Sequence, residues 1–242
     1  MKVAVILPAA GLGTRMGKVS AEHTGTSRKQ FMLLEGSPIL LHTVRKFVGA
    51  AGVSQIAVAV RAEDLEWVGG MLAQEFPGSK VRAVEGGNSR QQSVENALLS
   101  LEPDTELVAV HDAVRPFIDA ATIQKVFEEA AQTGAAIVGV PAVDTVKQVS
   151  RGTGTGRVHI RATLPRDKLV MAQTPQVFHY ELLKRAFESA RADGFVGTDE
   201  ASLVERLDVD VSVVMGSDRN IKITKPADMD LANLFFREEN RL

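Results

Sequence analysis

The sequence predicts an α/β fold built on a mostly parallel, twisted β-sheet with helices on both faces. Short runs of apolar, often β-branched residues alternate with segments whose apolar residues recur at steps of three and four. This alternation is typical of parallel sheets, because each crossover helix covers a face of the sheet. A glycine-rich loop directly follows the first run, and polar motifs follow several later ones. Since ligands of such folds bind at the carboxyl ends of the strands, we expect one cleft to collect these motifs.

The first part of the chain alternates strands with helices. Pro38 suits the first turn of a helix, and Gly134 is placed to end the helix that begins at Asp119. The expected strands are residues 3–7, 55–60, 81–84, 107–110 and 135–140, and the expected helices are 38–48, 63–75, 89–101 and 119–133.

Residues 144–164 break this alternation. Two β-branched halves flank three closely spaced glycines between residues 152 and 156, which predicts a β-hairpin. Because an isolated hairpin is marginally stable in water, we expect a projecting arm, residues 142–168, that packs on a second copy and gives a homodimer. The alternative is a hairpin that folds back to cover an edge of its own sheet.

Strands and helices alternate again beyond the arm. Thr198 is placed to be the N-cap of one of these helices, with acidic residues in its first turn. The expected strands are residues 170–172, 209–215 and 221–223, and the expected helices are 180–192, 198–207 and 226–239. Residues 1–242 are expected to form a single domain that carries the arm as a subdomain.

Composition narrows the possible functions. The chain has 242 residues, 45% of them hydrophobic, and no cysteine, which excludes disulfides, thiolate nucleophiles and Cys-ligated zinc and leaves oxygen ligands for any metal. A formal net charge of −2 argues against a general nucleic-acid binder. There is no apolar run long enough to cross a membrane and no signal-peptide cleavage pattern, so we expect a soluble, cytoplasmic protein.

The glycine-rich loop predicts a phosphate site. In PAAGLGTRMG, glycines allow successive backbone N–H groups to turn toward an anion, and Arg15 and the later Lys29 can add positive charge. Met16 stands where the dinucleotide-binding motif needs a small residue, and Val19 stands where a Walker loop needs Ser or Thr. A plain tight turn flanked by solvated cations is the alternative.

Several motifs together resemble one family. PAAGLGTRMG, KQ, GGNSRQQSV, HDAVRP, DTVK, TPQ, TDEAS and NIKIT are similar, in order and across nearly the whole chain, to motifs of the 2-C-methyl-D-erythritol 4-phosphate cytidylyltransferases. The resemblance implies a Rossmann-like nucleotidyltransferase fold with a projecting β-arm, a homodimer and a requirement for Mg²⁺. It also implies transfer of CMP from CTP to this polyol phosphate, with release of pyrophosphate, in the non-mevalonate isoprenoid precursor pathway.

The resemblance also assigns site residues. Arg15 and Lys29 would be catalytic, clamping the triphosphate and stabilising the five-coordinate phosphorus, while Asp112 would be catalytic as the Mg²⁺ ligand, in line with the preference of hard cations for carboxylates. His111 is expected to be structural. The CTP-binding residues would be Ala9, Ala10, Gly11, Gly13, Gly87, Asn88, Ser93 and Ala113. The acceptor-binding residues would be Arg115, Thr145, Arg166, Thr174, Thr198 and Lys222, with Thr145 and Arg166 reaching over from the arm of a second copy.

The sequence departs from the family pattern in places, and other functions remain open. The segment between Arg15 and Lys29 is longer than is typical, Arg28 stands where proline is common, and Asn88 stands where aspartate is common. A ribitol-5-phosphate cytidylyltransferase would share nearly every motif. A non-catalytic nucleotide-binding subunit is the alternative outside the enzymes. An NAD-dependent oxidoreductase is disfavoured, because Glu35 lies outside any expected strand.

Overall fold

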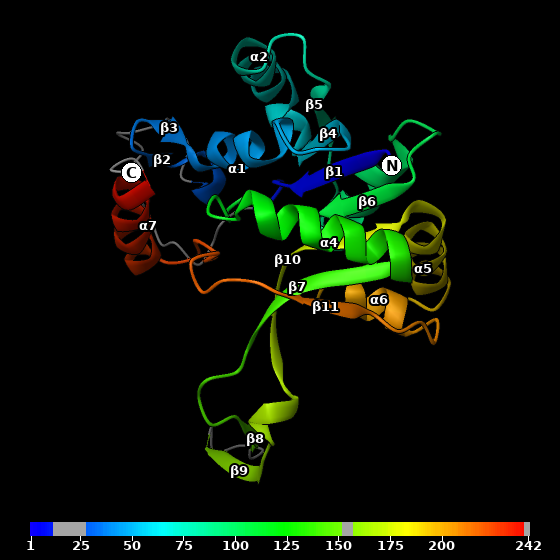
Figure 1. The fold of residues 1–242 in the computed structure, drawn as a ribbon, viewed down its shortest axis with the longest axis vertical. Coiled ribbons are helices and arrows are strands. Elements are labelled where there is room, and N and C mark those ends of the chain that lie inside the picture. Colours follow the sequence, from blue (N-terminus) through cyan, green and yellow to red (C-terminus); the bar gives the residue numbers. More distant parts are fainter. Residues whose placement is uncertain (12–27, 152–156, 240–242) are drawn as a thin grey trace.

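A seven-stranded sheet forms the centre of the molecule (Figure 1). The computed structural model describes residues 1–11, 28–151 and 157–239. The strand order is β11-β7-β10-β6-β1-β4-β5. The strands are β1 (Val3–Pro8), β4 (Val53–Val60), β5 (Val81–Glu85), β6 (Leu107–Val110), β7 (Ala135–Pro141), β10 (Val170–His179) and β11 (Ser212–Met215).

The sheet is mostly parallel, which confirms the predicted fold class. β1 pairs in parallel with β4 and β6, β4 with β5, and β7 with β11. Within this sheet, as far as the structure describes it, β10 is the one strand that runs antiparallel to its neighbours, which are β6 and β7. The carboxyl ends of β1, β4, β5 and β6 therefore meet at one edge of the sheet.

Helices cover both faces of the sheet. They are α1 (Ile39–Val48), α2 (Leu65–Glu75), α3 (Arg90–Leu99), α4 (Ala120–Thr133), α5 (Tyr180–Ala192), α6 (Ala201–Glu205) and α7 (Pro226–Glu239), with 3₁₀ turns η3 (Lys29–Phe31), η4 (Ala62–Asp64) and η5 (Arg166–Lys168). Alternate side chains of β1 point to opposite faces. Val5 joins a buried cluster with residues of α1, α2 and α4, whereas Ile6 joins a second cluster with residues of α3, α5 and α6.

The C-terminal helix belongs to a smaller cluster. Ala232 of α7 packs with Leu34, Val114 and Ile223. Leu34 lies in a small antiparallel hairpin, β2 (Leu33–Leu34) with β3 (Ser37–Pro38), that periodicity did not predict. Among the residues described, no helix is both long and apolar enough to cross a membrane.

Three helix ends agree with the sequence. Ser89 caps α3 by accepting a hydrogen bond from the Gln92 backbone N–H at 3.0 Å, and Asp119 caps α4 through the Thr122 N–H at 2.7 Å. Gly134 ends α4 with a φ of 90°, a conformation that favours glycine.

Three strands expected in the second half of the chain differ from those observed. The strand expected at 170–172 continues to His179, because the segment after Pro175 is held between β6 and β7. The strand expected at 209–215 is only Ser212–Met215, and residues 221–223 form no strand; the Ile223 N–H donates instead to the Val114 carbonyl at 3.0 Å.

The helix expected at 198–207 is shorter, and Thr198 is not its cap. α6 begins at Ala201, and the Asp199 carboxylate accepts the capping hydrogen bond from the Ser202 N–H at 3.0 Å. Asp and Thr are both good capping residues, so the choice between neighbours depends on the backbone path.

The arm is a separate two-stranded sheet. β8 (Lys147–Arg151) pairs antiparallel with β9 (Val158–Thr163), as the sequence predicts, while residues 152–156 lie outside the described part of the chain. Figure 1 shows the hairpin extending away from the central sheet beyond the end of β7, so it does not cover an edge of that sheet. Val149, Val158 and Ile160 of the hairpin are exposed.

Candidate functional site

A cavity of about 400 Å³ opens at the carboxyl ends of β1, β4, β5 and β6. Its walls come from six separate stretches of the chain: the first glycine loop, the Lys29–Gln30 pair, Arg61 after β4, the second glycine loop with the start of α3, the segment after β6, and residue Lys222. The residues are Pro8, Ala9, Ala10, Gly11, Lys29, Gln30, Arg61, Gly87, Asn88, Ser89, Arg90, Ser93, Asp112, Ala113, Val114 and Lys222. The predicted convergence of the motifs in one cleft is therefore observed.

The described part of the first glycine loop is tied to Gln30. The Gln30 side-chain amide is buried and donates to the carbonyls of Ala9 at 2.6 Å and Gly11 at 3.1 Å. The Ala9 N–H donates to the Ala59 carbonyl at 2.7 Å, which holds the start of the loop against β4. Gln30 is a support that sequence reasoning did not assign. Gly13 and Arg15 lie outside the described residues.

The second glycine loop needs glycine at its first position. A Cβ on Gly86 would lie 2.9 Å from the Ala10 Cβ and 3.1 Å from the Val60 carbonyl oxygen, so only glycine lets this loop pack against the first one. The Ser93 hydroxyl accepts from the Gly87 N–H at 3.0 Å and donates to the Ser89 carbonyl at 2.8 Å. Ser93 thus braces the loop from the first turn of α3.

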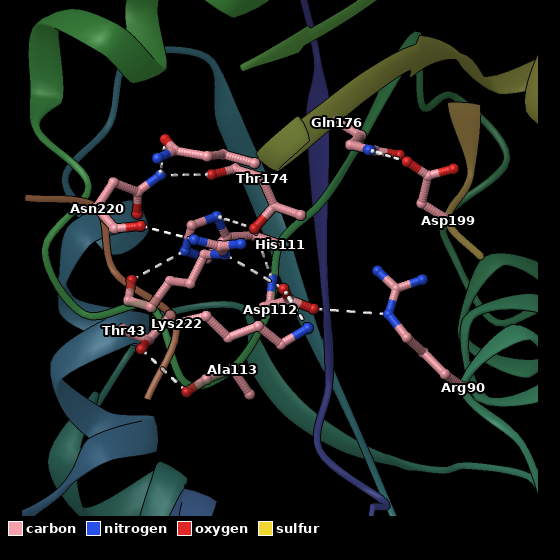
Figure 2. Close-up of polar contacts among 12 residues, drawn as sticks. Thr43, Arg90, His111, Asp112, Ala113, Thr174, Gln176, Asp199, Asn220 and Lys222 are labelled. Atoms are coloured by element: carbon pink, nitrogen blue, oxygen red, sulfur yellow. Dashed lines mark hydrogen bonds and ion pairs between the residues drawn. The ribbon is translucent and has the colours of Figure 1, made fainter. Parts of the chain in front are cut away.

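Asp112 lines the cavity and lies among three cations, of which Arg90 and Lys222 are labelled in Figure 2. Its carboxylate is 2.8 Å from Lys222 Nζ, 3.3 Å from Arg115 Nε and 3.5 Å from Arg90 Nε. Burial alone would raise the pKa of Asp112, but Lys222, Arg90 and Arg115 outweigh it and hold the pKa well below its usual range. The carboxylate is therefore ionised at neutral pH.

The donor set limits what kind of metal ion this site can hold. Within the described ranges, no group of three or more His, Cys, Asp or Glu side chains is arranged to hold a metal ion. Mg²⁺ is commonly bound by one or two carboxylates together with water and substrate phosphates. The single carboxylate of Asp112 fits that kind of site and does not fit an all-protein cage.

A buried polar network fixes the backbone around Asp112 (Figure 2). His111 is fully buried, and burial lowers its pKa to about 4, so the ring is neutral at pH 7. Its Nε2 lies 3.0 Å from the Arg115 carbonyl, which can only accept, so Nδ1 is left to accept from the Thr174 hydroxyl at 3.1 Å. The Thr174 oxygen in turn accepts from the Asp112 N–H at 3.0 Å. The role of His111 in these contacts is structural, as expected.

A second cavity, of about 200 Å³, adjoins the first. The two share Arg90, Asp112 and Lys222. The second cavity is lined by four of the predicted acceptor residues: Arg115, Thr174, Thr198 and Lys222. The other two, Thr145 and Arg166, line neither cavity; Arg166 is in the arm, where its guanidinium donates to the Val143 carbonyl at 2.7 Å.

Residues from α3 and β10 hold the segment that carries Thr198. Arg90 donates from both terminal nitrogens to the two Glu200 oxygens, at 2.7 and 2.9 Å, and Glu200 is 1% exposed. Burial acts to lower the pKa of Arg90, but Glu200 and Asp112 outweigh it and raise that pKa.

Two glutamines complete this support. The Gln176 amide donates to the Asp199 carboxylate at 2.8 Å (Figure 2), and the Gln91 side chain bonds the Phe195 carbonyl at 3.2 Å and the Gly197 N–H at 3.0 Å. Sequence reasoning gave no role to Gln91 or Gln176, and it expected Glu200 only as an acidic residue in the first turn of a helix. The motifs GGNSRQQSV, TPQ and TDEAS contain them, but nothing in the local pattern indicates that they meet.

Comparison with known proteins gives one consistent result. A family model described as 2-C-methyl-D-erythritol 4-phosphate cytidylyltransferase matches residues 3–238. Proteins of that name from Solibacter usitatus and Acidobacterium capsulatum are 75% and 53% identical, over 99% of this chain and 97% and 99% of theirs. The crystal structure of the protein of that name from Thermus thermophilus is 31% identical, with a TM-score of 0.75 over 98% of this chain and all of that one.

Proposed function

The chain belongs to the family of 2-C-methyl-D-erythritol 4-phosphate cytidylyltransferases, and from this premise we propose how its two adjoining cavities serve the reaction. The enzyme is a nucleotidyltransferase of the non-mevalonate isoprenoid pathway: it transfers CMP from CTP to 2-C-methyl-D-erythritol 4-phosphate and releases pyrophosphate. The larger cavity is proposed to bind CTP and the smaller one the acceptor. The observation that carries this division is that Arg90, Asp112 and Lys222 line both cavities, so the reacting groups can meet there.

Backbone and cation groups are proposed to hold the nucleotide. Ala9, Ala10 and Gly11 follow the carboxyl end of β1 and line the larger cavity. The Ala9 N–H is already bonded to Ala59, so the N–H groups of Ala10 and Gly11, with Gly13 of the same motif, are proposed to face the phosphate oxygens. Gly87, Asn88, Ser93 and Ala113 line the same cavity and are proposed to contact the nucleoside. Lys29, which also lines it, is proposed to stabilise the charge that develops on the α-phosphate, together with Arg15.

The chemistry needs positioning and charge stabilisation more than proton transfer. A phosphate oxygen of the acceptor attacks the α-phosphorus while the bond to pyrophosphate breaks in line with it. The acceptor phosphate is already ionised, so no general base is required. Arg115 and Lys222 are proposed to orient this phosphate, and Thr174 and Thr198 to bind the polyol hydroxyls.

We propose Mg²⁺ as the cofactor, with Asp112 as its protein ligand. Bound Mg²⁺ would neutralise charge on the nucleotide phosphates and on the departing pyrophosphate. The support for this assignment is that Asp112 is ionised, lines the larger cavity and is the carboxylate shared by both cavities.

The arm is proposed to complete the acceptor site of a second copy in a homodimer. Exposed Val149, Val158 and Ile160 give the hairpin apolar surface to bury, and Thr145 and Arg166 line neither of the two cavities of their own chain. Deleting residues 150–161 is expected to weaken both dimerisation and acceptor use. An unchanged sedimentation profile with unchanged acceptor kinetics would contradict this role.

The cytoplasmic location stays a prediction of the sequence.

Pyrophosphate release tests the activity and the acceptor together. With CTP and Mg²⁺, we expect release with 2-C-methyl-D-erythritol 4-phosphate and at least a tenfold lower kcat/KM with ribitol 5-phosphate, whose hydroxyls would leave some polar groups of the site unpaired. Faster release with ribitol 5-phosphate would identify a different acceptor. No release with either compound would indicate nucleotide binding without catalysis.

Lys29 is tested by replacing it with alanine. Loss of one preorganised charge at the transition state is expected to lower kcat about 100-fold or more. Activity near that of the unmodified enzyme would reject the assignment of Lys29.

A further inference from the structure

Lys29 lies between two residues whose side chains are both anchored. On its carboxyl side, Gln30 is buried and bonds the Ala9 and Gly11 carbonyls of the first glycine loop. On its amino side, both terminal nitrogens of Arg28 pair with the two carboxylate oxygens of Asp64, which is 2% exposed. A second carboxylate oxygen, Glu63 Oε1, lies 3.6 Å from Arg28 Nη1. Lys29 itself begins the 3₁₀ turn η3 and lines the larger cavity.

Two aromatic side chains, Trp67 and Phe31, pack beside the Arg28–Asp64 ion pair. The Trp67 indole N–H donates to Asp64 Oδ1 at 3.0 Å, and the Trp67 ring meets the buried Phe31 ring edge-on, with 4.7 Å between centroids. The Arg28 guanidinium lies 5.4 Å from the centroid of the same Phe31 ring. We call Arg28, Phe31, Asp64 and Trp67 the Arg28 anchor. Every member touches another member, so the group is held as a unit against the start of α2.

Among the described residues, the Arg28 anchor adjoins the lining of the larger cavity through the backbone of residue 29 and also through Arg61, whose carbonyl accepts from the Asp64 N–H at 2.9 Å. Of its four members, none lines either of the two cavities, whereas Lys29 and Gln30 line the larger one. A bidentate arginine–carboxylate pair fixes orientation as well as distance, because two parallel hydrogen bonds oppose rotation. With residues 28 and 30 both fixed, little backbone freedom remains at residue 29.

We propose that Arg28 and Asp64 are positioning residues that aim the Lys29 ammonium at the reacting phosphate. The inference rests on the proposed function, because it takes Lys29 as the group that acts on the nucleotide. Small displacements of a catalytic group are costly, with about 1 Å enough to lose on the order of 100-fold in rate. Release of one of the two fixed ends is therefore expected to lower kcat, with less effect on the KM for CTP.

The test is a double-mutant cycle between Asp64→Asn and Lys29→Ala. Asparagine keeps the size of residue 64 and an oxygen for the Trp67 hydrogen bond, but it removes the ion pair with Arg28. In the unmodified background, Asp64→Asn is expected to lower kcat about tenfold or more. In the Lys29→Ala background the same change is expected to lower kcat less than twofold, because the group it positions is gone. Arg28→Lys, which keeps the charge but loses the bidentate geometry, should behave in the same way and carries the test if Asp64→Asn does not fold.

Glu75→Gln is the matched control. It removes the ion pair between Glu75, the last residue of α2, and Arg45 of α1, and neither residue lines either cavity. We expect its kcat to be unchanged. Trp67 is the only tryptophan of the chain, so its fluorescence reports directly on whether each variant keeps the Arg28 anchor folded.

The outcomes separate the inference from the proposed function. If Lys29→Ala alone does not slow turnover, the assigned role of Lys29 fails and so does this inference. If Lys29→Ala slows turnover but Asp64→Asn and Arg28→Lys do not, only the positioning role is overturned. If Asp64→Asn costs the same factor in both backgrounds, it acts on stability or on another group, and the positioning role is again overturned.

Discussion

Glu200→Gln would show what the buried ion pair beside the acceptor cavity contributes to stability. Glu200 is almost completely buried, and both of its oxygens accept from Arg90 at 2.7 and 2.9 Å. Removing one partner of a buried pair typically costs about 3–5 kcal/mol, because the remaining charge is left without a partner. The Arg90 side chain is 32% exposed and keeps Asp112 at 3.5 Å, so the lower end of that range applies here. We therefore expect the free energy of unfolding to fall by about 3 kcal/mol.

Urea unfolding at pH 7, followed by far-ultraviolet circular dichroism at one protein concentration, measures this loss. With a slope of about 3 kcal/mol per molar, the midpoint should fall by about 1 M. Glu95→Gln is the matched control: it breaks a second Glu–Arg pair made by α3, with Arg191 at 2.8 Å, but Arg191 is 64% exposed. Such an exposed pair contributes about 0–1 kcal/mol. Equal midpoints for the two variants would refute the argument that burial, rather than the ion pair itself, sets the cost.

Three further predictions concern a helix cap, a glycine and the metal ion. Asp119→Ala should cost about 1 kcal/mol by uncapping α4. Burial acts to raise the pKa of Asp119, but hydrogen bonds from Thr122 outweigh it and lower that pKa. The contribution of the cap is therefore fully present above the unfolded-state pKa of about 3.9 and is lost as the pH falls through the lower folded-state value. Urea titrations from pH 7 to pH 3 should show that the stability difference between this variant and the unmodified protein shrinks. Gly86→Ala should weaken CTP binding, measured by calorimetry, at least tenfold, since the added Cβ would meet Ala10. Gly49→Ala is the control, because a Cβ there meets no atom within 4 Å, and it should leave CTP binding unchanged. An equal loss of affinity in the two variants would contradict the steric argument. EDTA should abolish pyrophosphate release reversibly. It should shift the melting temperature by less than about 2 °C, because the described residues include no group of three metal-ligand side chains that could hold a structural metal. A large loss of stability would indicate a structural metal.

Local signals in the sequence were sufficient for most elements of the fold. The strand at β1 was visible because its apolar run is continuous, as expected for a strand buried on both faces. Helix α4 was visible from its periodicity together with Asp119 and Gly134 at its ends. β10 was underestimated because Pro175 lacks an N–H and breaks the strand pattern, and only the neighbouring strands β6 and β7 keep the chain extended there. The strand predicted at 221–223, where Ile221 and Ile223 flank Lys222, is absent for the opposite reason, since a strand needs a partner strand as well as the right residues.

The sequence by itself determined which residues are available for the chemistry and where each stands relative to a strand end. The two glycine loops and Asp112 follow the ends of β1, β5 and β6, as their order in the chain required. Tertiary structure decided which side chains hold them in place: Gln30 on the first glycine loop, Asp64 on Arg28, and Glu200 on Arg90, the last pair 110 positions apart. Periodicity, caps and turn residues act over a few positions along the chain, whereas a buried polar group must pair with whatever the packing of distant elements brings beside it.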